Sequence, residues 1–157
     1  MGIEIERKFL LRDATWRDAV GTGTRYVQGY LGGDRCSVRV RREGDVAHLN
    51  IKSIALGTTR QEFEYAIPLD DAEALLASFC GQRVEKIRYH VDFAGKRWEI
   101  DEFLGDNAGL VVAEIELESE DEPFENPAWL GDEVTDDKRY YNVNLVQHPY
   151  CEWDEQC

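Results

Sequence analysis

The chain has 157 residues, of which 32 are acidic and 18 basic, for a formal net charge of −14. This length suits one domain with a real hydrophobic core, which we expect to span residues 1–157. The negative charge argues against non-specific binding to nucleic acid or to anionic membranes, although it leaves room for a local basic pocket. No apolar run is long enough to span a bilayer and the cysteines show no CxxC spacing, so we expect a cytoplasmic protein with reduced thiols.

The first predicted strand, residues 3–11, carries an unusual pattern of charge. Side chains in a strand alternate between faces, so Glu4, Glu6 and Lys8 point one way while Ile5 and Phe9 point the other. The Cα atoms of Glu4 and Glu6 are then about 7 Å apart, close enough for both carboxylates to approach one divalent ion. A solvated strand face is the alternative interpretation of this stretch taken alone.

The following segments repeat the pattern of one charged and one apolar face. A short helix is predicted near residues 14–20, and Gly32 and Asp34 belong to a hairpin turn. Strands are predicted over residues 25–31, 35–42, 46–53 and 60–67. Their polar faces carry Ser37, Arg39 and Arg41, then His48, Asn50 and Lys52, then Glu62 and Glu64.

The second half of the chain begins with a helix. Asp70 is the predicted N-cap, Glu73 its capping-box partner, and Gly81 ends the helix. Strands are then predicted over residues 83–93, 97–104 and 110–118, a surface loop to residue 129, a short helix or turn from residue 136, and a loose tail over residues 148–157. The charged faces of these strands carry Lys86, Arg88 and His90, then Glu99 and Asp101, then Glu114, Glu116 and Glu118.

So many two-faced strands joined by hairpin-length turns predict a mainly β (α+β) fold, a closed antiparallel barrel with a few flanking helices. The charges are also sorted by sign, because basic residues gather on some strands and acidic residues on others, whereas a solvated surface mixes signs. Sorted charges indicate a barrel interior with an acidic wall facing a basic wall. The apolar outer faces are then covered by helices, and their extent leaves a homodimer open.

Buried charges on this scale must be paired or coordinated. Divalent cations on the acidic wall and an oligophosphate on the basic wall satisfy both sets. Oxygen ligands favour Mg²⁺ or Mn²⁺ over zinc. The candidate bases are Lys8, Arg39, Arg41, Lys52, Lys86, Arg88 and Lys138, and the candidate acids are Glu4, Glu6, Glu62, Glu64, Asp101, Glu114 and Glu116.

This ordered set, beginning with Glu4-x-Glu6-x-Lys8, resembles the CYTH superfamily of triphosphate tunnel metalloenzymes over residues 3–142. The resemblance, strongest to small bacterial inorganic triphosphatases, implies an eight-stranded antiparallel barrel that binds a small triphosphate with Mg²⁺ or Mn²⁺. It implies that the candidate acids hold metal and the candidate bases hold phosphate. The catalytic residues it implies are Glu4, Glu6, Lys8 and Lys52.

Three functions remain open at this stage. The first is metal-dependent hydrolysis of tripolyphosphate to pyrophosphate and phosphate. The second is another reaction on the same scaffold, either cyclisation of ATP, for which the sequence gives no base-recognition signature, or hydrolysis of a nucleoside or thiamine triphosphate. The third is a non-catalytic module that binds polyphosphate or nucleotide. Clustered carboxylates weigh against the module, because a pure anion binder gains nothing from them.

Overall fold

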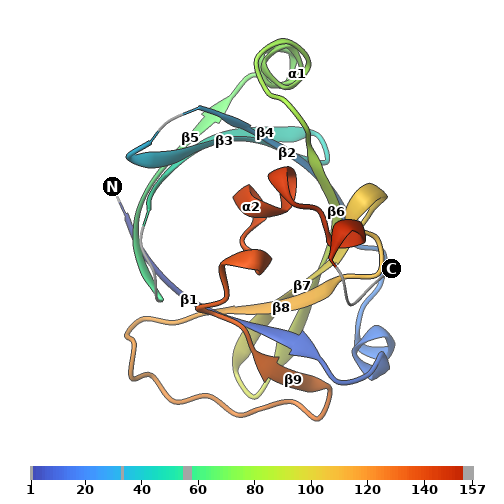
Figure 1. The fold of residues 1–157 in the computed structure, drawn as a ribbon. Coiled ribbons are helices and arrows are strands. Elements are labelled where there is room, and N and C mark those ends of the chain that lie inside the picture. Colours follow the sequence, from blue (N-terminus) through green and yellow to red (C-terminus); the bar gives the residue numbers. More distant parts are fainter. Residues whose placement is uncertain (1, 33, 55–57, 154–157) are drawn as a thin grey trace.

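The computed structural model, which describes residues 2–32, 34–54 and 58–153, is a closed antiparallel barrel (Figure 1). Its strands are β1 (Gly2–Leu11), β2 (Thr24–Leu31), β3 (Cys36–Glu43), β4 (Val46–Ser53), β5 (Thr59–Ile67), β6 (Val84–Phe93), β7 (Lys96–Phe103) and β8 (Val111–Glu116). The strand order β5-β4-β3-β2-β6-β7-β8-β1 is closed by pairing of β1 with β5, which confirms the predicted fold. None of the described helices is long and apolar enough to cross a membrane.

One strand was not expected from the sequence. The segment after β8 runs outside the barrel and then forms β9 (Leu130–Glu133), which pairs with the C-terminal half of β1. Two prolines and many acids precede β9, and its four residues show no clear alternation. The pairing is therefore set by tertiary contact rather than by local pattern.

Much of the outer face of the barrel is apolar and is covered by short elements. Trp98 of β7, which is fully buried, packs edge-on against Phe9, Phe124 and Trp129, so the segment between β8 and β9 covers this side. On the opposite side α1 (Leu69–Ser78) places Leu76 over β3 and β4. The 3₁₀ helix η1 (Thr15–Ala19) buries Trp16 against Tyr89.

The C-terminal segment lies within the ring of strands (Figure 1). It contains η3 (Lys138–Tyr140), α2 (Asn142–Gln147) and η4 (Tyr150–Glu152). Leu145 and Tyr140 are buried with Val84, Phe103 and Val112, which are side chains of β6, β7 and β8. One end of the barrel is thus filled by an apolar layer, and we call residues 138–147 the plug.

Two local predictions were wrong. Asp70 is not the N-cap of α1, because the helix already begins at Leu69 after Pro68 and shows no side-chain cap. Glu73 pairs instead with Arg42 of β3. The loose tail predicted from residue 148 is also contradicted as far as Trp153, whose indole is 5% exposed and packs against Tyr140 and Tyr150. The remaining residues of that predicted tail, 154–157, lie outside the described residues.

We predict that Trp153→Ala lowers the free energy of unfolding by about 3–5 kcal/mol, because a buried aromatic side chain is lost and a cavity remains. Urea unfolding followed by fluorescence measures the change. Phe79→Ala is the control, since Phe79 is 73% exposed and its removal is expected to change stability by less than about 0.5 kcal/mol. Equal stability of Trp153→Ala and the wild type would mean that the C-terminal segment does not hold the plug.

Candidate functional site

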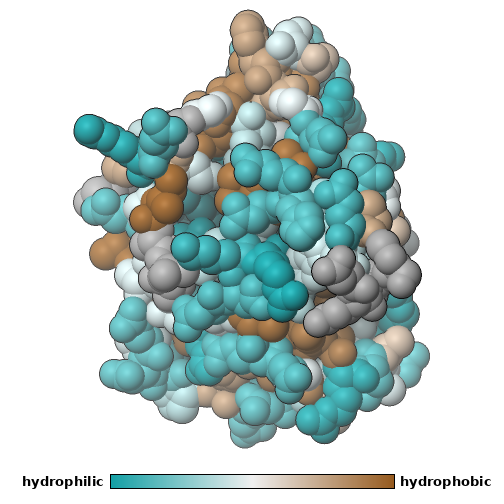
Figure 2. All heavy atoms as spheres, viewed as in Figure 1, coloured by the Kyte–Doolittle hydropathy of each residue, from teal (hydrophilic) through white to brown (hydrophobic). Residues whose placement is uncertain are grey.

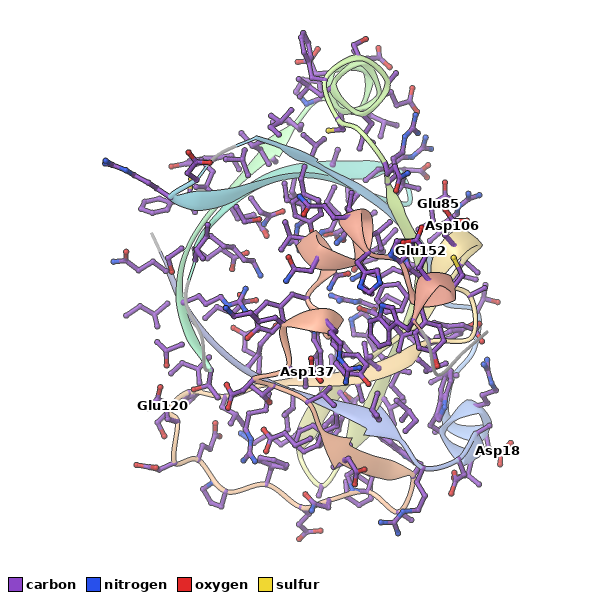
Figure 3. All side chains as sticks on the ribbon, in the orientation of Figure 1. Asp18, Glu85, Asp106, Glu120, Asp137 and Glu152 are labelled. Carbon is purple, nitrogen blue, oxygen red and sulfur yellow. The ribbon has the colours of Figure 1, made fainter. Side chains whose placement is uncertain are left out.

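The barrel encloses two adjoining cavities, and together they contain most of the predicted site. The larger has a volume of about 790 Å³ and reaches from the barrel centre to the plug. The smaller, of about 440 Å³, lies toward Gly2. Glu4, Arg39, Arg88 and Glu116 line both, so the two are parts of one charged interior. Figure 3 shows many side chains projecting into the ring of strands, while Asp18 and Glu120 project away from it.

The placement of the predicted residues follows the strand alternation closely. Every candidate base lines the larger cavity: Lys8, Arg39, Arg41, Lys52, Lys86, Arg88 and Lys138. Of the candidate acids, Glu4, Glu6, Glu114 and Glu116 line it too, and Glu62 and Glu64 line the smaller cavity. Asp101 lines neither cavity, because it is fully buried behind basic side chains.

Asp101 holds two of the bases together. Its carboxylate accepts hydrogen bonds from Arg88 Nε at 2.7 Å and Arg88 Nη2 at 2.8 Å, while Lys86 Nζ lies 2.8 Å from Oδ2. Burial alone raises the pKa of Asp101, but Arg88 and Lys86 outweigh it and hold the pKa below its usual value. For Lys86 burial is the larger effect and lowers the pKa to about 8, although Asp101 opposes it. Arg88 also pairs with Glu99.

The lysines of β1 and β4 are also paired with carboxylates. Lys52 Nζ lies 2.7 Å from Glu4 Oε2, and Lys8 Nζ lies 3.3 Å from Glu114 Oε1. Burial lowers the pKa of Lys8, but Glu114 and Glu6 more than offset it and raise the pKa above its usual value. Lys8 and Glu114 face each other on the neighbouring strands β1 and β8, so the sheet register brings them together, whereas the Lys52–Glu4 pair reaches across β5, which lies between β4 and β1.

The two arginines of β3 differ in their partners. Arg41 pairs with Glu43, and its Nη2 lies 3.8 Å from Glu64 Oε2. Burial, together with the nearby Arg39, lowers the pKa of Arg41. Arg39 is only 9% exposed, its Nε has no hydrogen-bond partner, and no carboxylate among the described residues pairs with it. A buried guanidinium without a counter-ion is a strong attractor for an anion.

The carboxylates of β1 and β8 crowd one another. Glu6 lies directly opposite Glu116 in the strand register, and Lys8 lies opposite Glu114. Burial raises the pKa of Glu6 to about 8, and the charges of Glu114 and Glu4 add to the effect. Burial also raises the pKa of Glu116, again helped by Glu4. Such repulsion is relieved by a proton or by a divalent cation.

No three acidic, histidine or cysteine side chains within the described ranges converge closely enough to hold a metal ion as they stand. The reason is visible in the ion pairs, because Glu4 is turned to Lys52 and Glu114 to Lys8. A cation that uses Glu4 or Glu114 on this wall therefore requires that carboxylate to exchange its lysine partner for the metal.

The plug contributes three consecutive contacts that the sequence did not reveal. The carbonyl oxygen of Tyr140 accepts a hydrogen bond from Lys8 Nζ at 3.1 Å, and Asn142 Oδ1 accepts one from Lys86 Nζ at 3.2 Å. Between them, the guanidinium of Arg60 lies over the ring of Tyr141, 4.7 Å from the ring centroid. Residues 140–142 thus touch cations from three different strands.

The residues missed by sequence reasoning fall into two kinds. Arg60 and Glu99 share faces with predicted site residues, Arg60 with Glu62 and Glu99 with Asp101, so their alternation was a usable signal. Tyr141 and Asn142 gave no such signal, because only the return of the chain into the barrel brings them to the site.

Comparison with known proteins agrees with this architecture. The family model of the CYTH domain matches residues 2–150. The chain is 46% identical over 157 residues to an inorganic triphosphatase of Acetivibrio thermocellus, covering 99% of this chain and 100% of that protein. It is 40% identical over 148 residues to an inorganic triphosphatase of Nitrosomonas europaea, covering 91% and 96%.

A solved structure shows the same likeness in three dimensions. The crystal structure of an inorganic triphosphatase superposes with a TM-score of 0.65 at 36% identity, covering 93% of this chain and 95% of the other. With a family model that matches nearly the whole length and two relatives of nearly equal length, this chain belongs to the CYTH domain family.

Proposed function

We propose that this protein hydrolyses inorganic tripolyphosphate to pyrophosphate and phosphate inside the barrel, with the help of a divalent cation. The observation that carries the proposal is the larger cavity. There Arg39, which pairs with no carboxylate of the described residues, and the crowded carboxylates of β1 and β8 face the same space. An anion satisfies the first and a cation the second. The activity named for the two relatives supports the same reaction.

In this proposal the phosphate chain is bound by the bases that line the cavity. Arg39 and Arg41 enter from β3, Lys86 and Arg88 from β6, and Lys8, Lys52 and Lys138 complete the set. Guanidinium groups donate paired hydrogen bonds to phosphate oxygens, and ammonium groups act as point charges. Lys8 and Lys52, which lie beside the carboxylates of Glu114 and Glu4, stabilise the negative charge that develops on the phosphoryl oxygens.

The metal belongs on Glu4, Glu6 and Glu116, with Glu62, Glu64 and Glu114 close by. The donor set fits, because it consists of oxygen ligands, which favour Mg²⁺ or Mn²⁺. Burial first, and then the charges of Glu114 and Glu4, raise the pKa of Glu6, and a nearby cation offsets both effects. The bound ion supplies Lewis-acid polarisation of the phosphoryl group and a more acidic water. For Asp101 we propose a positioning role on Lys86 and Arg88 instead of the metal ligation predicted from the sequence.

The extent of the domain, its location and its substrate class are proposed from the sequence. We propose one domain over residues 1–157 that works in the cytoplasm on a small triphosphate. ATP cyclisation and hydrolysis of a nucleoside or thiamine triphosphate are the competing reactions.

A panel of triphosphates tests the function. With Mg²⁺ or Mn²⁺ we expect tripolyphosphate to yield pyrophosphate and phosphate, and we expect excess EDTA to abolish turnover until either metal is restored. Ion chromatography identifies the products. Cyclic AMP and pyrophosphate from ATP would replace the proposal by cyclisation, tight binding without turnover would make the protein a binding module, and full activity in EDTA would exclude the metal.

The strand register gives a matched pair of variants. Arg41→Ala should lower kcat/KM by well over tenfold, since loss of one partner of a buried charged hydrogen bond typically costs about 2–5 kcal/mol. Arg41→Lys should recover only part of the loss, because the fork of donors is missing. Arg42→Ala is the control, because Arg42 points outward to Glu73 and to the carbonyl of Gly44. A damaging Arg42→Ala beside a silent Arg41→Ala would place the substrate outside the barrel.

The raised pKa of Glu6 predicts a pH dependence of stability. Its carboxyl has a pKa of about 8 in the folded protein against an ordinary value of 4.5, so between these values the folded state binds more protons than the unfolded state. The free energy of unfolding of the metal-free protein should therefore fall as the pH rises from about 5 to about 8. Urea unfolding in EDTA measures this slope.

Glu6→Gln should flatten the slope, because the titrating group is gone, and Mg²⁺ should stabilise the wild type more at the upper end of this pH range than at the lower end. An unchanged slope in Glu6→Gln would mean that Glu6 is already ionised in the metal-free protein.

A further inference from the structure

The cations of the larger cavity divide into two groups by their partners. Lys8, Arg41, Lys52, Lys86 and Arg88 each form an ion pair with a carboxylate. Arg39, Arg60 and Lys138 line the same cavity, and none of them pairs with a carboxylate of the described residues. An entering anion binds the second group without first displacing a carboxylate, so these three cations are available to phosphate without the loss of an ion pair.

Arg60 is the cation of this group that sequence reasoning did not include. It lies directly opposite Glu4 in the register of β1 and β5, yet the carboxylate of Glu4 is bound to Lys52 at 2.7 Å. The guanidinium of Arg60 instead lies over the ring of Tyr141, 4.7 Å from the centroid. A guanidinium stacked on an aromatic face keeps its in-plane N–H donors available for a second partner.

The platform under Arg60 is fixed by the plug and by Thr135, which precedes it. The hydroxyl of Tyr141 donates to the carbonyl oxygen of Thr135 at 3.0 Å, and its backbone N–H donates to the carbonyl oxygen of Lys138 at 3.1 Å. The ring is therefore held by bonds on both sides. Arg60 is positioned by this ring, and so its place depends on the plug rather than on an ion pair.

The two cavities give the cations an order along the interior. Arg39 lines both cavities, whereas Arg60 and Lys138 line only the larger one, together with Asn144 and Gln147 of the plug. Arg39 thus lies at the centre and Arg60 toward the plug. In Figure 2 hydrophilic residues gather over the middle of this face, where Figure 1 places the plug. The larger cavity therefore offers cations at its centre, at Arg39, and toward the plug, at Arg60.

We propose that Arg60, held on Tyr141, is a specificity-determining residue that binds the outermost phosphate of a linear chain and so distinguishes three phosphates from two. The inference rests on the proposed function. It adds that the plug end of the cavity selects substrates by the length of their phosphate chain. Pyrophosphate occupies the central cations and does not reach Arg60, whereas tripolyphosphate does. Arg60 therefore contributes to the binding of the longer chain alone.

The test compares Arg60→Gln with the wild type. We expect the KM for tripolyphosphate to rise roughly tenfold, because one charge-assisted contact to phosphate is lost, with kcat changed less than about twofold. The inhibition constant of pyrophosphate against tripolyphosphate should change less than about twofold. Tyr141→Leu should shift the same ratio in the same direction, since it removes the platform. Arg60→Lys should restore part of the affinity for tripolyphosphate, because the charge remains.

Arg25→Gln is the matched control, because Arg25 lies on the exposed outer face of β2 in a pair with Glu85. An equal rise of both constants in Arg60→Gln, or no change in either, overturns the inference while wild-type turnover leaves the proposed function standing. If the wild type shows no turnover of tripolyphosphate, the function fails instead, and calorimetric titration of the same two anions into both proteins decides the role of Arg60.

Discussion

The whole structure depends on compensating a large number of charges inside a β-barrel. A closed sheet of eight strands must place every second side chain inside, and here those side chains are mostly charged. An uncompensated charge in such a place is very costly, and breaking a buried pair typically costs about 3–5 kcal/mol. The fold is consequently favoured in a register that brings most of these acids to a base. Asp101 is the clearest case, since its single carboxylate serves both Lys86 and Arg88.

This constraint explains why the acidic and basic residues occupy different strands. Neighbouring strands of opposite sign pair across the sheet, as Lys52 of β4 does with Glu62 of β5, and Lys52 also reaches Glu4 of β1 on the far side of β5. Where two acidic strands meet, as at Glu6 and Glu116, the register leaves repulsion that the resident lysines only partly relieve. Where a basic residue pairs with no carboxylate of the described residues, as at Arg39, its charge remains uncompensated. The proposed ligand sites are thus the places where internal compensation is incomplete.

Much of this arrangement follows from alternation alone. Period-two patterning placed Glu4, Glu6 and Lys8 on one face of the strand. In the structure this face points into the barrel, where so many sorted charges can be paired. Alternation does not indicate how deeply a side chain is buried, however. Asp101 and Glu114 look alike in the sequence, but Asp101 is sealed behind its two cations while Glu114 reaches the cavity. Depth depends on the shear of the barrel and on neighbouring side chains, which a single strand does not encode.

The C-terminal segment shows the other limit of sequence reasoning. The sequence predicted a short helix or turn from residue 136 and a loose tail from residue 148, whereas the described part of this segment is held in place by the apolar surface that it covers. Val84, Phe103 and Val112 end the charged faces of their strands with apolar side chains, and this layer requires a cover that Leu145 and Trp153 provide. Burying that layer fixes residues 140–142 at the cavity wall. Hydrophobic packing at one end of the barrel thereby sets the geometry of the charged groups in its middle.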